Sequence, residues 1–209
     1  LKNPLDEVIE PRATQEEMTN FIETELTESL KGLPTRTTQF GRFDKGLAYT
    51  ILMKYYMHEK NWAKAEECGR ELLKAEYGYG LMDRYADIFT LENEGNKEII
   101  FACTEERGTN LQLWHDHALP GNYPTKNASI QKWDGYKVPW PFYRTFEEGD
   151  DRLSVLVGEY VGTDGVLFNE ESDIAKHGNL YSGAVPVKYG EDPESTGDGS
   201  QIDLVVYRY

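Results

Sequence analysis

The chain has 209 residues, of which 39% are hydrophobic and 12% aromatic, and its formal net charge is −15 at pH 7. This length allows one large domain or two small ones, and it is enough to bury a core. The acidic balance argues against nucleic acid and anionic membrane surfaces as partners, because both attract basic proteins. A neutral ligand or a cationic protein surface fits the charge better.

The ends and the cysteines of the sequence give further expectations. The chain begins at Leu1 without a Met or a signal peptide and ends on an apolar run, 202–209, which favours a piece of a longer protein. No apolar run reaches the roughly 18 residues that a membrane span needs. Cys68 lies in a helical pattern and Cys103 in a strand pattern, outside any CxxC motif. We expect both to be small buried side chains, and a disulfide between them stays open.

The first predicted helix covers 14–31. Thr14 and Glu17 have the spacing of a capping box, which marks a helix start. Gly32 and Pro34 follow as stop signals. One face of this helix carries an apolar stripe that recurs every four residues: Met18, Ile22, Leu26 and Leu30, with Phe21 beside it.

Two further helices, 43–58 and 62–76, are predicted to form a hairpin. Asn61 can cap the second helix. The large and small positions match a tetratricopeptide-like repeat, with an ordinary amphipathic hairpin as the alternative. Such a repeat rarely stands alone, so the helix at 14–31 could be half of another unit. The residues expected to face inward are Leu47, Ala48, Ile51, Leu52, Tyr55, Tyr56, Trp62, Ala65, Gly69, Leu72 and Leu73.

The second half of the sequence is less regular. We predict a turn and a short helix at 77–89, a strand at 99–103, a short helix and a turn at 142–153, and a β-hairpin around 163–165. Residues 107–145 carry Gly, Pro, Asn, His and Trp at short intervals without a lasting period. A loop of this length in a compact domain is usually functional or disordered, and its aromatic content argues against disorder.

Five segments occur in an order that resembles a known family. They are the helical pair GRFDKGLAYTILMKYYMHEKNWAKAEECGRELL, then YADIF, NKEIIFA, DDRL and the terminal LVVYRY. Together they resemble the SusD/RagB family of Bacteroidetes nutrient-uptake proteins over nearly the whole chain. Arg208 and Tyr209 match the start of an Arg-Tyr-Ala-Glu helix in that family. Its Phe-x-x-x-Asp-x-Arg-like turn is matched by Phe146, Asp150, Asp151 and Arg152.

The resemblance implies a fold class and a domain organisation. Family members carry four tetratricopeptide-like helix pairs, so this chain would be the middle of such a protein. We therefore expect a mainly α fold with SusD-like helical pairs, a loop-rich region and a few short strands. The chain would form a single domain fragment over 1–209. Its helical-repeat part would be 14–90, and its loop-rich, ligand-binding part 91–209.

The resemblance also implies a function. Family members bind glycans, or sometimes peptides, at the cell surface, cap a TonB-dependent (SusC-like) outer-membrane transporter and are not generally enzymes. We expect a non-catalytic, cofactor-free component that binds an oligosaccharide and passes it to such a transporter. The outer-membrane lipid anchor of the full-length protein would lie before Leu1. The alternatives are a protein-interaction module without a small ligand, a peptide-binding family member and a carbohydrate-active enzyme.

Aromatic residues of the loop region form the candidate ligand site. Sugars present flat C–H faces that pack on indole and phenol rings, while neighbouring polar side chains bind the hydroxyl groups. Pro139 and Pro141 flank Trp140 and stiffen its loop. The rings could instead serve packing, by holding the loop against the helices. The predicted ligand-binding residues are Trp114, Trp133, Trp140, Tyr123, Tyr136, Asn122, Asp134 and His115, with Tyr143 and Asn110 in the same stretch.

Three other chemistries are less favoured. His115 and His117 have strand spacing that would put both rings on one face, but a metal site needs a third ligand and Asp116 would point the other way. The carboxylates at 147–151 are of the kind that glycosidases use, yet they match the family's turn. The acidic loop at 191–203 could hold Ca²⁺, but it lacks the spacing of an EF-hand. The sequence has no G-x-S-x-G, P-loop or G-x-G-x-x-G motif, which favours a binding protein over an enzyme.

Overall fold

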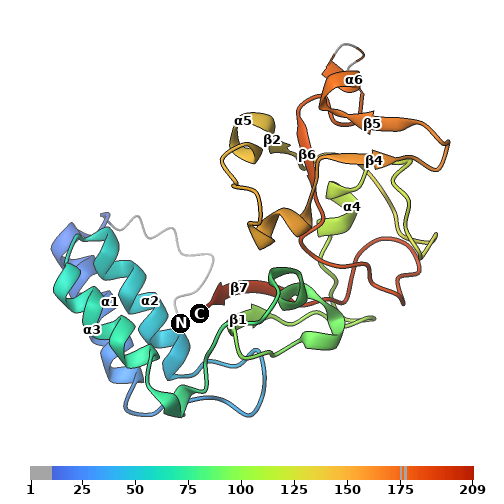
Figure 1. Ribbon diagram of the computed structural model, residues 1–209. Coiled ribbons are helices and arrows are strands. Elements are labelled where there is room, and N and C mark those ends of the chain that lie inside the picture. Colours follow the sequence, from blue (N-terminus) through green and yellow to red (C-terminus); the bar gives the residue numbers. More distant parts are fainter. Residues whose placement is uncertain (1–10, 175, 177) are drawn as a thin grey trace. The chain divides into compact units, whose positions relative to one another are not determined.

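The computed structural model describes residues 11–174, 176 and 178–209, which fall into two compact units (Figure 1). The helical unit takes the chain up to Thr37 and Phe43–Tyr77. The loop-rich unit takes Thr38–Arg42 and Gly78–Tyr209. None of the helices in the described part of the chain has both the length and the apolar character of a membrane span. That the two units form one domain stays a prediction.

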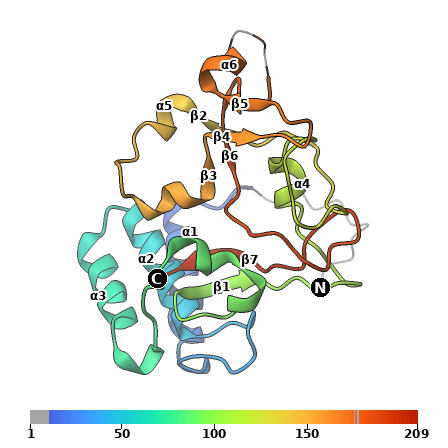
Figure 2. The same cartoon turned by 45° about the vertical axis from the view of Figure 1, so that its right-hand side comes forward.

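In the described part of the helical unit, three α-helices lie side by side in both views (Figure 1 and Figure 2). A short 3₁₀ turn, η1 (Ala75–Tyr77), follows them. The helices are α1 (Gln15–Ser29), α2 (Lys45–His58) and α3 (Trp62–Leu72).

A side-chain cap begins each of these helices. The Thr14 hydroxyl accepts a hydrogen bond from the Glu17 N–H at 3.2 Å, and the Glu17 carboxylate accepts one from the Thr14 N–H at 2.8 Å. The predicted capping box is therefore confirmed. Asp44 caps α2 by accepting the Leu47 N–H at 3.0 Å, and Asn61 caps α3 as predicted.

The core of the helical unit lies between α2 and α3. Leu52 and Tyr56 of α2 pack against the small side chains Ala65 and Cys68 of α3. Leu26 and Leu30, from the apolar stripe of α1, pack against this cluster and are partly buried. Small residues on α3 let the two helices approach closely, so the predicted helical pair is confirmed.

Several positions of the helical unit that were expected to be covered are exposed instead. Trp62 and Leu73 are 62% and 64% exposed, and Phe21 of α1 is 60% exposed. None of the residues of α1 is buried. Besides α1, which covers part of the pair, the described part of this unit has no further α-helix to cover these side chains. The helical-repeat prediction is therefore confirmed for one pair only.

Short antiparallel strands form three small sheets in the loop-rich unit. One sheet pairs β1 with β7, the second has the order β2-β6-β3, and the third is the hairpin β4–β5. The strands are β1 (Ile99–Cys103), β2 (Val138–Pro139), β3 (Leu156–Val157), β4 (Glu159–Val161), β5 (Leu167–Asn169), β6 (Gly183–Pro186) and β7 (Leu204–Arg208).

Short helices interrupt the loops of the same unit. They confirm the predicted short helices in 77–89 and 142–153. These helices are η2 (Tyr85–Phe89), η3 (Leu91–Asn93), α4 (Trp114–Ala118), α5 (Trp140–Tyr143), η4 (Asp151–Val155) and α6 (Glu170–Ile174).

Strand β1 confirms the predicted strand and pairs with the end of the chain. Ile99 lies opposite Arg208, and Cys103 lies opposite Leu204. Arg208, which the resemblance matched to the start of a helix, is the last residue of β7, and its guanidinium pairs with Glu98 at 2.6 Å. Cys68 is buried as expected, but Cys103 is exposed because it ends the strand beyond its buried part.

The predicted hairpin around 163–165 is confirmed as β4–β5. Gly165 adopts a φ of +77° in its turn, a conformation that favours glycine. The Gly162 N–H donates to the Val166 carbonyl at 2.8 Å and closes the turn. Here the local sequence alone determines the structure.

Two hydrophobic clusters form the core of the loop-rich unit. The short helix η2 was expected in the helical part, but Ile88 and Phe89 pack in the second cluster and place it in the loop-rich unit. Long helices occur only in the helical unit among the described residues, so the mainly α prediction is confirmed in part. The first cluster is Leu119, Ile130, Trp140, Tyr160, Leu180, Ala184 and Val185. The second is Ile88, Phe89, Ile99, Ala102, Tyr189 and Ile202.

Candidate functional site

The short helix α4 carries the His-Asp-His sequence for which strand-like alternation was predicted. That prediction is wrong, because successive residues of a helix turn by about 100° rather than 180°. His115 and Asp116 are buried, whereas His117 is half-buried. The Gln112 side chain stabilises the start of the turn by accepting the Trp114 N–H at 2.6 Å.

Backbone hydrogen bonds fasten the following loop to the end of α4. The N–H groups of Gly135 and Tyr136 both donate to the His117 carbonyl at 2.7 Å. The Trp133 N–H donates to the Asp116 carbonyl at 2.6 Å. These donors satisfy carbonyl groups that the end of a helix leaves unpaired. The loop is therefore ordered around α4 without any ligand.

Trp133, His117 and Tyr136 together form what we call the aromatic surface. The ring centroid of His117 lies 4.9 Å from that of Trp133 and 5.1 Å from that of Tyr136. Trp133 is 44% exposed and Tyr136 is 45% exposed. Behind them, the half-buried Trp114 contacts Tyr136 at a centroid distance of 5.4 Å. The sequence-predicted rings Trp133, Tyr136 and Trp114 thus lie together.

The two other polar candidates differ in their availability. Asp134 lies in the loop between the rings and pairs with Lys137, and its side chain is 34% exposed. The Asn122 side chain is engaged in hydrogen bonds within the protein. Its oxygen accepts one from the Tyr160 hydroxyl at 2.9 Å and one from the Asn179 side-chain amide at 2.7 Å. Asp134 is available to a ligand, and the side chain of Asn122 is used by the fold.

Trp140 was predicted as a stacking platform and is a core residue instead. It is 7% exposed and belongs to the first hydrophobic cluster. Its indole N–H donates to the Leu180 carbonyl at 2.9 Å. The ring therefore offers no open face to a sugar. Pro139 and Pro141 position Trp140 at the start of α5, in the core.

A buried pair of ionisable residues lies on the inner side of α4. Asp116 accepts the Gly199 N–H with both carboxylate oxygens, at 3.0 and 3.2 Å. Neither ring nitrogen of His115 has a hydrogen-bond partner in the described part of the chain, although Nε2 lies 3.4 Å from the Asp116 carboxylate. Burial lowers the pKa of His115 from its usual value, so the imidazole is neutral at pH 7.

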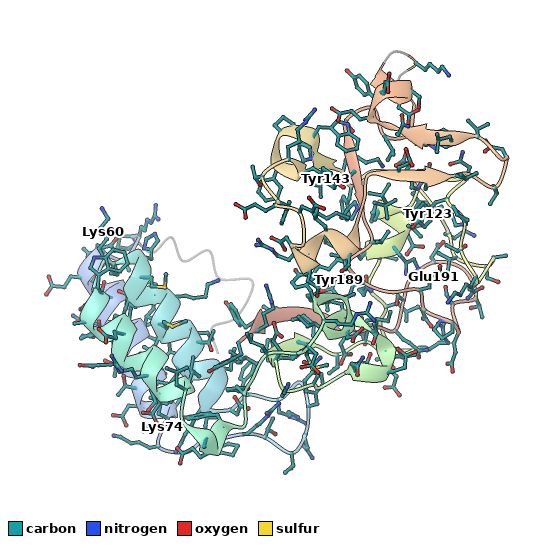
Figure 3. The ribbon with its side chains drawn as sticks, viewed as in Figure 1. Lys60, Lys74, Tyr123, Tyr143, Tyr189 and Glu191 are labelled. Atoms are coloured by element: carbon teal, nitrogen blue, oxygen red, sulfur yellow. The ribbon has the colours of Figure 1, made fainter. Side chains whose placement is uncertain are left out.

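A cavity of about 210 Å³ lies against His115. Burial, with the nearby Glu191 carboxylate, raises the pKa of Tyr123, so its hydroxyl keeps its proton. Figure 3 labels three of the lining side chains, Tyr123, Tyr189 and Glu191. Predicted residues Trp114, His115 and Tyr123 meet here. The full lining is Trp114, His115, Ala118, Leu119, Tyr123, Pro186, Val187, Tyr189, Gly190 and Glu191.

Carboxylates of the acidic loop have structural partners. Asp192 accepts the N–H groups of Gln201 at 3.0 Å and Glu194 at 2.9 Å, and it pairs with Arg107 at 2.7 Å. Asp203 accepts the Glu105 N–H at 2.8 Å. Over the described ranges, no three His, Cys, Asp or Glu side chains are grouped to hold a metal ion.

Sequence reasoning did not select three residues of these sites as ligand-binding. His117 was considered as a metal ligand or, in preference, as a hydrogen-bonding loop histidine, although its position beside an aromatic loop was a usable signal. Tyr189 and Glu191 come from a distant segment, and no local pattern links them to α4. Only the fold brings that segment to the wall of the cavity.

No protein-family model matches the sequence, and no curated protein matches it. Solved structures do match its fold. A SusD superfamily protein from Parabacteroides distasonis superposes with a TM-score of 0.72 at 17% identity, covering 97% of this chain and 46% of that one. Surface glycan-binding protein A from Bacteroides uniformis has a TM-score of 0.69 at 18% identity, covering 93% of this chain and 42% of that one.

A third structure was solved with a ligand. Surface glycan-binding protein A from Bacteroides thetaiotaomicron, in complex with laminarihexaose, has a TM-score of 0.67 at 19% identity. The match covers 93% of this chain and 46% of that one. This chain therefore spans less than half the length of each of the three proteins. It has a SusD-like fold over the matched part.

Proposed function

We propose that this SusD-like chain is part of a cell-surface protein that binds an oligosaccharide by aromatic stacking at the aromatic surface. The observation that carries the proposal is the arrangement of Trp133 and Tyr136. Both rings are close to half exposed, and both flank His117 within about 5 Å. Large rings that serve only as core are not left open in this way.

The chemistry of the aromatic surface suits a neutral, hydroxylated ligand. Indole and phenol faces pack on the C–H faces of sugar rings, and their polar atoms stay wetted. Asp134, between the two rings in sequence, can accept hydrogen bonds from hydroxyl groups. The loop is already ordered by its bonds to α4, so binding loses little conformational entropy. The net charge of −15 disfavours anionic ligands.

The fold comparison supports the same proposal. One protein of similar fold was solved with laminarihexaose bound. By analogy with the family that the sequence resembles, the bound oligosaccharide passes to a SusC-like, TonB-dependent outer-membrane transporter. By the same analogy, a lipid anchor holds the full-length protein at the outer membrane. The chain acts without covalent chemistry and without a cofactor.

A second candidate function is protein docking by the helical unit. Trp62, Leu73 and Phe21 are each at least 60% exposed. Where such side chains form one contiguous patch, the patch is typical of a surface that contacts other proteins. This function is compatible with glycan binding by the other unit, and a peptide ligand at the aromatic surface is the alternative to a glycan.

Affinity electrophoresis against a panel of plant, host and microbial glycans tests the proposal. We expect one glycan class to retard the wild-type chain, and Trp133→Ala and Tyr136→Ala each to abolish the retardation. Trp62→Ala is the matched control, because Trp62 is exposed in the other unit. Melting curves establish that each variant is folded. Retardation that survives both substitutions, or that Trp62→Ala removes equally, would contradict the proposal.

A further inference from the structure

The β4–β5 hairpin has one face packed on the core and one face open to solvent. Tyr160 and Phe168 lie opposite each other on the inner face, with their rings stacked at a centroid distance of 5.1 Å. Side chains alternate along a strand, so the neighbours of these two residues point outward. On the outer face Val161 lies opposite Leu167, and these side chains are 54% and 48% exposed. The hairpin therefore leaves an apolar cross-strand pair open.

The apolar pair continues into a polar pair on the same face. Glu159 lies opposite Asn169, whose side-chain amide donates to the Glu159 carboxylate at 3.1 Å. Residues two apart on one strand lie roughly 7 Å apart and share a face. The two pairs thus form one surface, which we call the hairpin face: Glu159, Val161, Leu167 and Asn169.

An open pocket of about 650 Å³ begins at the polar end of the hairpin face. The half-buried Tyr143, labelled in Figure 3, forms an aromatic wall of this pocket. Its ring lies 5.4 Å, between centroids, from that of Trp140, which stays in the core. Three glutamates line the other sides, so we call it the acidic pocket. Its full lining is Trp140, Tyr143, Gly158, Glu159, Asn169, Glu170 and Glu171.

The carboxylates of the acidic pocket exceed the cations beside them. Glu170 pairs with Arg144, but Glu159 and Glu171 are exposed and pair with no cation among the described residues. The lining itself contains no Lys, Arg or His. Like charges that share a pocket repel one another, and a cation between them relieves the repulsion. A cation over the ring of Tyr143 also gains a cation–π interaction.

We propose that the hairpin face and the acidic pocket together dock a partner protein through a basic, apolar segment. A Lys or Arg side chain of the partner enters the acidic pocket, and an apolar residue beside it covers Val161 and Leu167. Contiguous apolar and charged areas of this kind are typical of protein contacts. The surface adds a partner to the glycan binding proposed above and does not depend on it.

Charge complementarity selects this occupant over two others. A second copy of the chain carries the same net charge of −15 and the same acidic pocket, so it is repelled. A free amine fills the pocket alone and leaves Val161 and Leu167 exposed. A basic segment of another protein satisfies both the carboxylates and the apolar pair.

The docking surface is held in place without a partner. A Cβ at Gly158 would lie 2.9 Å from the Tyr143 hydroxyl, so the glycine leaves room for this ring beside the hairpin. The Asn169 amide orients the Glu159 carboxylate, and Arg144, which follows α5, pairs with Glu170. Binding therefore loses little conformational entropy on this side of the contact.

Fluorescence anisotropy with labelled, end-blocked peptides tests the acidic half on the whole chain. The probes are Lys-Val-Arg-Val-Lys and its acidic counterpart Glu-Val-Glu-Val-Glu. We expect wild type to bind only the basic peptide, and Glu159→Gln/Glu171→Gln to weaken this binding at least about threefold. No binding of the basic peptide to folded wild type would overturn the proposal.

A matched double variant separates docking from general attraction to an acidic protein. Glu147→Gln/Glu148→Gln removes the same charge from an exposed turn of the same unit, outside the acidic pocket. We expect it to keep the affinity for the basic peptide within about twofold of wild type. Equal weakening by the two double variants would overturn the proposal.

Leu167→Thr tests the apolar half. It keeps a residue suited to a strand and removes apolar area, so we expect about two- to fivefold weaker peptide binding. Leu81→Thr is the control, because Leu81 is 63% exposed in the same unit, and it should match wild type. Unchanged affinity of Leu167→Thr, or equally tight binding of Nα-acetyl-lysine amide, would mean that the pocket takes a free amine and would overturn the docking surface.

The other occupants and the glycan site give different results. A dimer in sedimentation velocity that Leu167→Thr abolishes would place a second copy on the hairpin face and overturn the proposal. Peptide binding by this chain that the full-length protein lacks would place another segment of the same protein there, with the same consequence. Glu159→Gln/Glu171→Gln should keep the glycan retardation of wild type. Loss of that retardation in the folded variant would make the pocket part of the glycan site and overturn a separate partner surface.

Discussion

The ring of Trp133 lies edge-on against the ring of His117, with centroids 4.9 Å apart and planes at 78°. The backbone carbonyl of His117 also accepts the Gly135 and Tyr136 N–H groups. One residue of α4 thus fixes both the backbone and the rings of the neighbouring loop. The aromatic surface is a product of the fold rather than of a mobile loop, and the predictions below depend on that rigidity.

Of the tryptophans in the loop-rich unit, we expect Trp133 to be needed for glycan binding and Trp140 to be needed for stability. Trp140→Ala should lower the free energy of unfolding by about 3–5 kcal/mol, because it empties a buried site and removes the bond to Leu180. Trp133→Ala should change it by less than about 1 kcal/mol while it abolishes glycan binding. Urea unfolding of both variants checks this. Equal destabilisation by the two would contradict the assignment of Trp133 to the surface.

Gly183 at the start of β6 should not tolerate a side chain. A Cβ there would overlap the backbone carbonyl of Val138 on β2, and backbone cannot move aside as a flexible side chain can. We expect Gly183→Ala to cost about 1–3 kcal/mol in a urea titration. Gly121→Ala is the control, since nothing lies within 4 Å of a Cβ at that position. A neutral Gly183→Ala would mean that β2 and β6 pair differently.

Asn122 should be a stability residue rather than a ligand contact. Asn122→Ala removes the acceptor of the Tyr160 hydroxyl and of the Asn179 amide, both of which then lose a partner. We expect a loss of about 1–3 kcal/mol, measured by thermal or urea unfolding. Glycan affinity of the folded variant, measured below its melting temperature, should stay within about twofold of wild type. A selective loss of affinity without a loss of stability would return Asn122 to the ligand site.

Glu94 should make the stability depend on pH near neutrality. Desolvation of its carboxyl group, together with the nearby Asp203, raises the pKa of Glu94 to about 7 from an ordinary value of 4.5. Between these two pH values the folded chain binds a proton that the unfolded chain has released. This group therefore lowers the free energy of unfolding as the pH rises from 4.5 to 7.

Replacing Glu94 isolates this contribution. We expect Glu94→Gln to reduce the fall in urea midpoint between pH 5 and pH 8 relative to wild type. Glu92→Gln, two residues away in η3, is the control and should follow the wild-type curve. Superimposable pH curves for wild type and Glu94→Gln would rule out a raised pKa at this position.

Local signals in the sequence predicted the local structure well. The capping box at Thr14 and Glu17 and the cap at Asn61 require only neighbours in sequence, and both are present. The turn at Gly165 likewise depends on one backbone conformation. Where neighbours three or four residues away provide the partner, the sequence carries the information needed.

Exposure of the loop aromatics could not be predicted in the same way. Trp133 and Trp140 both lie in the irregular, aromatic-rich stretch 107–145, yet one is open and the other is in the core. The difference arises from β6 and Leu180, which lie far along the chain and cover Trp140. The helical turn of α4 was missed for a related reason, because the loop N–H groups that satisfy its carbonyls come from residues 133–136.

Isothermal titration calorimetry tests glycan binding at the aromatic surface most directly. The ligand is the glycan that retards wild type, and the proteins are wild type, Trp133→Ala and Trp62→Ala. We predict that Trp133→Ala, with an unchanged melting temperature, loses at least about tenfold in affinity, as expected for the loss of an aromatic stacking partner. Trp62→Ala should match wild type. Equal affinity of folded Trp133→Ala and wild type would contradict the account.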